Sequence, residues 1–162
     1  MKKGEKGILL GIAVVSVGMM LFQGVMVSQE AEKDPGIPFY STASKEVQSA
    51  ATVLYRKYKC RDCHSLWGLR NIMQSVPAPS LDGMGSLRSE QWLFEYFSAE
   101  DPQKILPSRL KPEFRMPSFA HLPESERRLL ARYVASLKVE DWYLKETQKA
   151  EYEKLTGEEY RP

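Results

Sequence analysis

Cysteine and histidine are rare in this chain, which limits the metal sites that it can form. The 162 residues include only two cysteines, Cys60 and Cys63, and two histidines, His64 and His121. A closed structural zinc site takes four ligands, so it would need all of them. His64 directly follows Cys63 and could hardly reach the same ion as its neighbour. The composition therefore argues against structural zinc.

Runs of β-branched residues are absent around the two cysteines, which argues against a second kind of chemistry. A C-x-x-C pair that exchanges disulfides is expected at the start of a helix inside a βαβ unit. No segment near the pair reads as a parallel strand, and the chain contains no internal repeat. Nothing in the sequence suggests nucleic-acid binding. The pattern favours an all-α fold and leaves a third chemistry for the cysteines.

Cys60, Cys63 and His64 form a C-x-x-C-H motif. Cysteines three residues apart are near neighbours on one helical face, so both sulfurs can form thioethers with the two vinyl groups of one haem. The adjacent histidine can then bind the iron. The motif predicts one covalently attached haem c.

A long uncharged run begins near the N-terminus. Residues 8–27 provide 20 uncharged residues, enough for a helix to span the hydrocarbon core of a bilayer. Lys2, Lys3 and Lys6 precede the run, and the positive-inside rule keeps them in the cytoplasm. A cleaved signal peptide is the alternative, but its apolar region is usually about 7–15 residues long, and "VMVSQEA" is a poor cleavage site. We expect a single-pass anchor in the cytoplasmic membrane, with the following residues on the periplasmic or extracytoplasmic side.

These patterns divide the chain into five segments. We expect a cytoplasmic N-terminus (1–7), a transmembrane helix (8–27), a linker (28–43), a haem domain (44–138) and a helical C-terminal extension (139–162). Prolines, a glycine and mixed charges mark the linker as extended. The expected class is all-α.

Within the haem domain, apolar residues recur at helical spacing in three places. The first helix follows Ser44, the second is capped by Ser89 and the third opens at Pro123. The intervening loops, 71–87 and 101–124, contain prolines that exclude long helices. The apolar positions expected on the buried faces are Val47, Ala51, Leu54, Tyr58, Trp92, Leu93, Tyr96, Phe97, Leu129, Leu130, Tyr133, Val134 and Leu137.

This order of a helix ending in C-x-x-C-H, a proline-bearing loop, a middle helix, a Met-Pro loop and a terminal helix resembles the single-haem cytochromes c whose iron is bound by histidine and methionine. The resemblance covers residues 44–138. In that family the first and last helices cross at a small residue and an aromatic, which implies a contact between Ala51 and Tyr133. The chain has alanine at position 51, where glycine is usual.

The resemblance also implies which residues surround the haem. The segment "APSL" is similar to the family's Gly-Pro-x-Leu, with alanine replacing the glycine. It implies that Pro79 offers its carbonyl to the second ring nitrogen of His64, which fixes the tautomer, and that Leu81 walls the haem. Arg88 and Trp92 resemble positions that hydrogen-bond the haem propionates. The alternatives are a surface arginine and a core tryptophan.

Met116 is the sixth iron ligand that the resemblance implies. It lies in "RMPSF" directly before the terminal helix, as in the family, and a thioether favours ferrous iron and raises the reduction potential. Apart from Met1, the other methionines outside the apolar run are Met73 and Met84. The alternatives are that Met116 only packs the core beneath a loop, or that His121 binds the iron instead.

Charge divides unevenly between the haem domain and the tail. Residues 45–138 carry 15 basic and 10 acidic residues, a net charge of +5, whereas residues 139–162 carry 4 and 7, a net charge of −3. Basic residues beside the motif could steer an acidic redox partner, or form only a solvated helix end. They are Arg56, Lys57, Lys59 and Arg61.

The tail favours a helix to about Leu155, with Gly157 as a natural stop. It also holds more aromatic surface than a solvated tail needs, which we expect another subunit to cover, the alternative being the tail's own domain. The aromatic residues are Trp142, Tyr143, Tyr152 and Tyr160.

The sequence therefore predicts a membrane-anchored one-electron carrier in a respiratory complex that oxidises quinol or acts as a terminal reductase. With both axial positions filled the iron has no site for substrate, so we expect no catalytic residues here and any catalytic centre in a partner. Redox proteins and other subunits are the expected partners. The alternatives are a haem-based sensor or ligand-binding enzyme with a labile sixth ligand, and the small subunit of a nitric oxide reductase-like complex.

Overall fold

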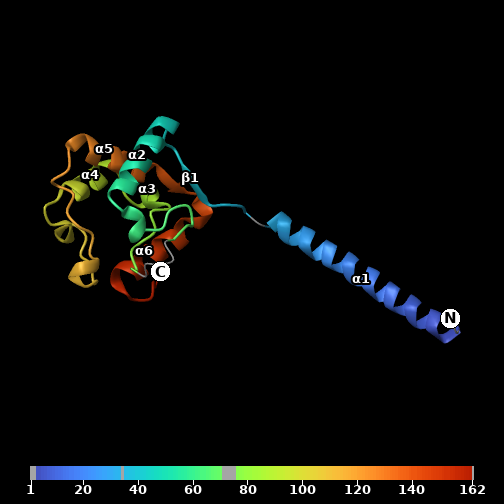
Figure 1. Cartoon of the computed structure of the whole chain (residues 1–162). Helices are drawn as coiled ribbons and strands as arrows, with labels where there is room; N and C mark the ends of the chain where they lie inside the picture. The colour runs from blue at the N-terminus through green and yellow to red at the C-terminus, as the bar shows by residue number, and fades with distance from the viewer. Residues whose placement is uncertain (1–2, 34, 71–75, 162) are drawn as a thin grey trace. The chain divides into compact units, whose positions relative to one another are not determined.

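The chain divides into two compact units, Met1–Ile37 and Pro38–Pro162. The computed structural model describes residues 3–33, 35–70 and 76–161, and Figure 1 traces the elements of each unit. The first unit is a single helix, and the second is a mostly helical domain. The expected all-α class is confirmed for the chain as a whole.

Helix α1 (Lys3–Lys33) contains the apolar run. Its segment Lys6–Met26 has 21 residues and a mean hydropathy of 2.2, and none of that segment is buried by protein. At a rise of about 1.5 Å per residue it is about 31 Å long, which matches the hydrocarbon core of a bilayer. Length and composition thus allow it to cross a membrane, and a signal sequence near the N-terminus meets the same test.

Helix α1 continues beyond the expected boundary at residue 27 and ends at Lys33. The reason is that "SQEAEK" is made mostly of residues that favour helix. The segment 28–43, which we expected to be an extended linker, therefore begins as helix, and its residues 39–41 form a strand. Only its middle part matches the expectation.

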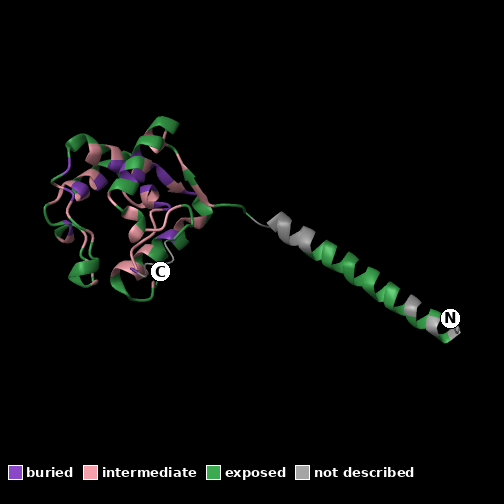
Figure 2. Ribbon diagram, viewed as in Figure 1, coloured by how far each residue is buried: buried purple, intermediate pink, exposed green. Residues whose placement is uncertain are grey.

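Three helices build the core of the second unit: α2 (Lys45–Lys57), α4 (Glu90–Ser98) and α5 (Glu124–Ser136). Helices α2 and α4 both pack on α5, and buried residues concentrate where they meet (Figure 2). The predicted cap at Ser89 is present, since its Oγ accepts from the Trp92 N–H, and Ser44 Oγ likewise accepts from the Val47 N–H at the start of α2. Each cap satisfies a backbone donor that the helix start leaves without an intrahelical partner.

Helices α2 and α5 cross at a small cluster of buried residues. Ala51 is fully buried and lies in one cluster with Tyr133 and Leu137, which confirms the contact that the resemblance implied. A second cluster joins α2 to α4 and to the loop before α5, through Leu54, Leu93, Phe97, Phe119, Leu122, Leu130, Ala131 and Val134. All the apolar positions expected on buried faces are buried or pack against these clusters.

The domain also contains one antiparallel strand pair that the sequence did not predict. Strand β1 (Phe39–Ser41) pairs with β2 (Leu137–Val139), with Phe39 opposite Val139. The two strands have three residues each, too few to show an alternating pattern, and their partners are far apart in the sequence. Ser41 Oγ and Ser136 Oγ, 3.0 Å apart, add a side-chain contact. The strand pair holds the first residues of the domain against the segment that follows α5.

Short helices occupy the segments between the core helices. Part of the predicted loop 71–87 is helix α3 (Met84–Leu87), while residues 71–75 of that loop lie outside the described residues. Gly85 makes this packing possible, because a Cβ there would lie 2.0 Å from the Ala135 carbonyl oxygen. The remaining short elements are η1 (Cys60–Asp62), η2 (Pro102–Lys104), η3 (Pro112–Phe114) and η4 (Asp141–Tyr143).

The tail forms helix α6 (Leu144–Thr156), and Gly157 ends it with φ +77°, as predicted. The tail packs partly on its own domain, which was the alternative, and the expectation that another subunit covers its remaining aromatic surface stays a prediction. Thr147 is buried against the domain itself, because the tail is amphipathic and its inner side meets the turn at Gly83. Trp142 nevertheless keeps half of its surface exposed.

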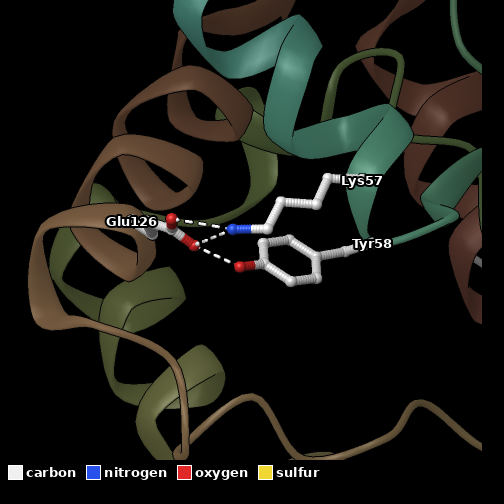
Figure 3. Close-up of polar contacts among 3 residues, drawn as sticks. All are labelled: Lys57, Tyr58 and Glu126. Carbon is white, nitrogen blue, oxygen red and sulfur yellow. Dashed lines mark hydrogen bonds and ion pairs between the residues drawn. The ribbon is translucent and has the colours of Figure 1, made fainter.

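One polar cluster joins the end of α2 to the start of α5. Figure 3 shows Lys57 and Tyr58 pointing at the carboxylate of Glu126, with Lys57 Nζ 3.0 Å from Oε1 and the Tyr58 hydroxyl donating to Oε2. These hydrogen bonds lower the pKa of Glu126. Lys57, one of the basic residues beside the motif, is therefore already paired within the domain.

Replacing Gly85 by alanine tests the close approach of α3 to α5. The Gly85→Ala variant should lose about 3 kcal/mol of stability, a fall in Tm of about 10 °C, because the backbone carbonyl that it meets cannot yield like a flexible side chain. Thermal melting of the full chain in detergent, followed by far-UV circular dichroism, measures this loss. The control Gly68→Ala, at φ +67° but in open space, should cost only about 1 kcal/mol. Equal melting of the two variants would contradict the packing of α3.

Candidate functional site

A cavity of about 370 Å³ opens between the C-x-x-C-H segment, α4, α6 and the loop before α5. Its volume lies in the range of small-molecule and cofactor sites. Most of the residues that the sequence proposed for the site line it together: Cys60, Cys63, His64, Pro79, Leu81, Trp92 and Met116.

The motif begins where α2 ends. Lys59 adopts φ +55°, which stops the helix, and the chain then forms the tight turn η1. The His64 N–H donates to the Cys60 carbonyl at 2.9 Å, so the cysteines and the histidine share one short turn. The two thiols are not joined in a disulfide.

Both thiols are poorly suited to disulfide exchange. Burial raises the pKa of Cys60 to about 11 and also raises the pKa of Cys63. Exchange chemistry needs a thiolate, which reactive cysteines obtain through a lowered pKa. Neutral thiols facing an apolar cavity fit covalent attachment to a hydrophobic ring instead.

His64 is held in the orientation and tautomer that a metal ligand requires. Its Nδ1 lies 2.7 Å from the Pro79 carbonyl oxygen, the contact that the resemblance implied. Since a carbonyl only accepts, Nδ1 carries the proton and Nε2 keeps its lone pair. Burial lowers the pKa of His64, and the Pro79 hydrogen bond opposes this effect only in part. The lowered pKa favours the neutral imidazole, which is the form that binds metals.

Asp82 fixes the Pro79 segment to the chain that follows the motif, and the sequence reading missed it. This buried carboxylate accepts from the Trp67 N–H at 2.6 Å, the Gly68 N–H at 3.0 Å and the Ser80 hydroxyl at 3.0 Å. An aspartate before a glycine usually reads as an ordinary turn residue, so the sequence held no signal of this role. Its effect is to keep the Pro79 carbonyl within reach of His64.

The candidates for the sixth ligand differ in whether they line the cavity. Met116 and Met84 both line the cavity, whereas His121 is exposed and is not part of the lining. Met73 lies outside the described residues. Residues 99–123, which we name the Met116 loop, contain a 3.3 Å hydrogen bond from Gln103 Nε2 to the Met116 carbonyl, which ties Met116 to the first part of the same loop.

Trp92 and Arg88 differ in their relation to the cavity. Trp92 lines it and stacks on Tyr96, with ring centroids 5.3 Å apart. Arg88 does not line it; its guanidinium lies 5.1 Å from the centre of the Trp92 ring and 3.0 Å from the Glu151 carboxylate. Burial raises the pKa of Glu151, against the opposing effect of Arg88.

Glu151 and Leu155 of α6 also line the cavity, and the sequence reading missed both. They lie beyond the residues covered by the resemblance, and in the sequence they look like ordinary positions of an amphipathic helix. Only the docking of α6 on its own domain brings them to the site.

The donor set fits a haem rather than a bare ion. Within the described residues, no group of three or more His, Cys, Asp or Glu side chains could hold a metal ion. An imidazole, a thioether and two thiols around a largely apolar cavity match an iron porphyrin attached through its vinyl groups. His64 and Met116 are the groups available for its axial positions.

Removing the carboxylate of Asp82 tests its hold on the Pro79 segment. Asp82→Ala should lower the free energy of unfolding by about 2–3 kcal/mol, because hydrogen bonds to a charged acceptor are lost. The stability of Asp82→Asn should lie between those of Asp82→Ala and the wild type. Thermal melting measures the loss. The exposed Asp141→Ala serves as control and should melt like the wild type. If Asp82→Ala also melted like the wild type, the hydrogen bonds of Asp82 would not stabilise the Pro79 segment.

The comparisons with known proteins agree with this geometry. A sequence model of the family described as cytochrome c matches residues 49–138, more than half of the chain. No curated protein and no solved structure matches the chain. Because the matched region contains the C-x-x-C-H motif of Cys60, Cys63 and His64, one haem c is bound covalently there, and the chain belongs to the cytochrome c family.

Proposed function

We propose that this cytochrome c is a membrane-anchored one-electron carrier with haem iron bound by His64 and Met116. Members of its family are typically electron carriers rather than enzymes. The observation that carries the proposal is the cavity that His64 and Met116 both line, in a chain that also has a helix long enough to span a membrane.

The bound haem supplies a one-electron couple between ferric and ferrous iron. Cys60 and Cys63 hold the ring, and the Pro79 hydrogen bond keeps His64 oriented toward the iron. Met116 would supply the second protein ligand to the iron and so leave no open position for a substrate. The apolar walls keep water away, so the domain sets the reduction potential and does no bond-making chemistry.

Two methionine variants test the assignment of the sixth ligand. Met116→Ala should remove the far-red sulfur-to-iron band of the oxidised protein, allow carbon monoxide to bind the reduced protein and lower the midpoint potential, because the soft neutral ligand is lost. Met84→Ala is the matched control, since Met84 lines the same cavity and should keep the band. Absorption spectroscopy and a redox titration measure all three properties.

The opposite result, a lost band in Met84→Ala and an unchanged one in Met116→Ala, would move the ligand to Met84. A wild-type protein that lacks the band and binds carbon monoxide readily would favour the alternative of a sensor or ligand-binding haem. In both outcomes the proposed ligation by Met116 fails.

The proposal places the haem domain on the periplasmic or extracytoplasmic side, within a respiratory complex that oxidises quinol or serves as a terminal reductase. Lys2, Lys3 and Lys6 support this orientation through the positive-inside rule. The half-exposed Trp142 supports contact with another subunit. Exposed Arg56 and Arg61 beside the motif would favour an acidic redox partner.

Membrane extraction tests the anchor. The haem protein should stay in the membrane through an alkaline carbonate wash, leave it only with detergent, and have the mass of an uncleaved chain plus one haem. The control is a form that starts at Pro38 behind a cleavable signal peptide, which should be released in soluble form. A mature protein that lacks residues 1–27 and washes off would show that the helix is a signal sequence. Subunits that co-purify in mild detergent would identify the complex.

A further inference from the structure

Helix α6 lies outside the part of the chain that matches the cytochrome c family, yet it lines the haem cavity. The match ends at residue 138, and α6 runs from Leu144 to Thr156. Glu151 and Leu155 face the cavity, and the Glu151 side chain is only 11% exposed. The same two residues also line a second, more polar hollow between α6 and the segment 86–88, so they contribute to both.

The domain holds α6 at three points along its length. Near its start, Thr147 packs so closely on the turn at Gly83 that a Cβ at Gly83 would lie 3.0 Å from the Thr147 methyl carbon. In its middle, Glu151 pairs with Arg88 at 3.0 Å. At its end, Arg109 Nε donates to the Lys154 carbonyl at 3.2 Å.

The third contact matters most for the site, because Arg109 belongs to the Met116 loop. The loop before α5 and helix α6 belong to different parts of the chain, as the colours in Figure 1 show, and residues of both line the cavity. The Arg109 hydrogen bond joins them, and Gly157 allows the close approach, since a Cβ there would lie 3.0 Å from Arg109 Nε. The tail is thus fastened to the segment that carries the proposed sixth ligand.

We propose that α6 is a wall of the haem site that keeps the Met116 loop closed over the iron. Leu155 excludes water from the cavity, Glu151 sets the local charge, and the Arg109 contact limits opening of the loop. This inference rests on the proposed ligation by Met116. Loss of the wall should increase the fraction of molecules in which the loop is open and an external ligand can reach the iron.

The test compares full-length holoprotein with a form truncated after Tyr143 and with two point variants, Leu155→Ala and Arg109→Gln. Truncation should speed carbon monoxide binding to the reduced protein roughly tenfold or more, since it removes buried apolar cover and a loop contact together. On heating, the oxidised truncated form should lose its far-red sulfur-to-iron band at a lower temperature than the wild type does. The point variants should show the same changes to a smaller extent, with the haem still covalently attached.

The charge of the wall has its own matched pair of variants. Glu151→Gln should shift the midpoint potential upward, because a negative charge near the iron favours the ferric state. Glu146→Gln is the same substitution on the same helix at an exposed position and should leave the potential unchanged. Because the point variants retain α6, their far-UV spectra and Tm values separate an effect on the site from unfolding.

The proposal that α6 is a wall of the haem site would be overturned if the truncated form and Leu155→Ala both kept the wild-type rate of carbon monoxide binding, far-red band and midpoint potential. Failure of the Met116 assignment has a different signature, because either the wild-type protein would lack the sulfur-to-iron band or the band would survive in Met116→Ala. In that case the comparison of Glu151→Gln with Glu146→Gln decides whether α6 belongs to the site, and equal potentials would reject it.

Discussion

The hydrogen bond between His64 Nδ1 and the Pro79 carbonyl is the constraint on which the site depends. It fixes both the tautomer and the direction of the imidazole, and neither property follows from the C-x-x-C-H motif alone. Asp82 supports this bond, because it ties the Pro79 segment to the backbone after the motif together with the hydrogen bond from the Leu81 N–H to the Ser65 carbonyl. A buried carboxylate is stable there because it accepts several hydrogen bonds, so a costly group becomes a rigid support.

The helix crossing sets the position of the motif in space. Ala51 and Tyr133 bring α2 onto α5, and the turn that carries Cys60 and His64 begins directly after α2. The Lys57 and Tyr58 contacts with Glu126 fix the end of α2 at the start of α5. Since α5 also follows the Met116 loop, one helix pair positions both sides of the cavity.

The sequence predicted those features whose cause is local. Ser89 as a cap and Gly157 as a stop depend on a few neighbouring residues, and the C-x-x-C-H spacing carries its chemistry within five positions. The pairing of β1 with β2 and the role of Asp82 depend on segments that meet only in the folded chain. The contribution of Glu151 to the cavity was hidden for the same reason, because nothing in the tail's own pattern shows where it docks.

The ion pair of Arg88 and Glu151 is better explained by the site than by stability. Removing two charges from water costs about as much as their attraction returns, so a partly buried pair adds little to folding. Apolar residues of similar size would seal α6 to the domain at least as well. In the proposed wall, a charged pair beside the haem would instead fix the register of α6 and the electrostatic potential at the cavity, to which the reduction potential responds.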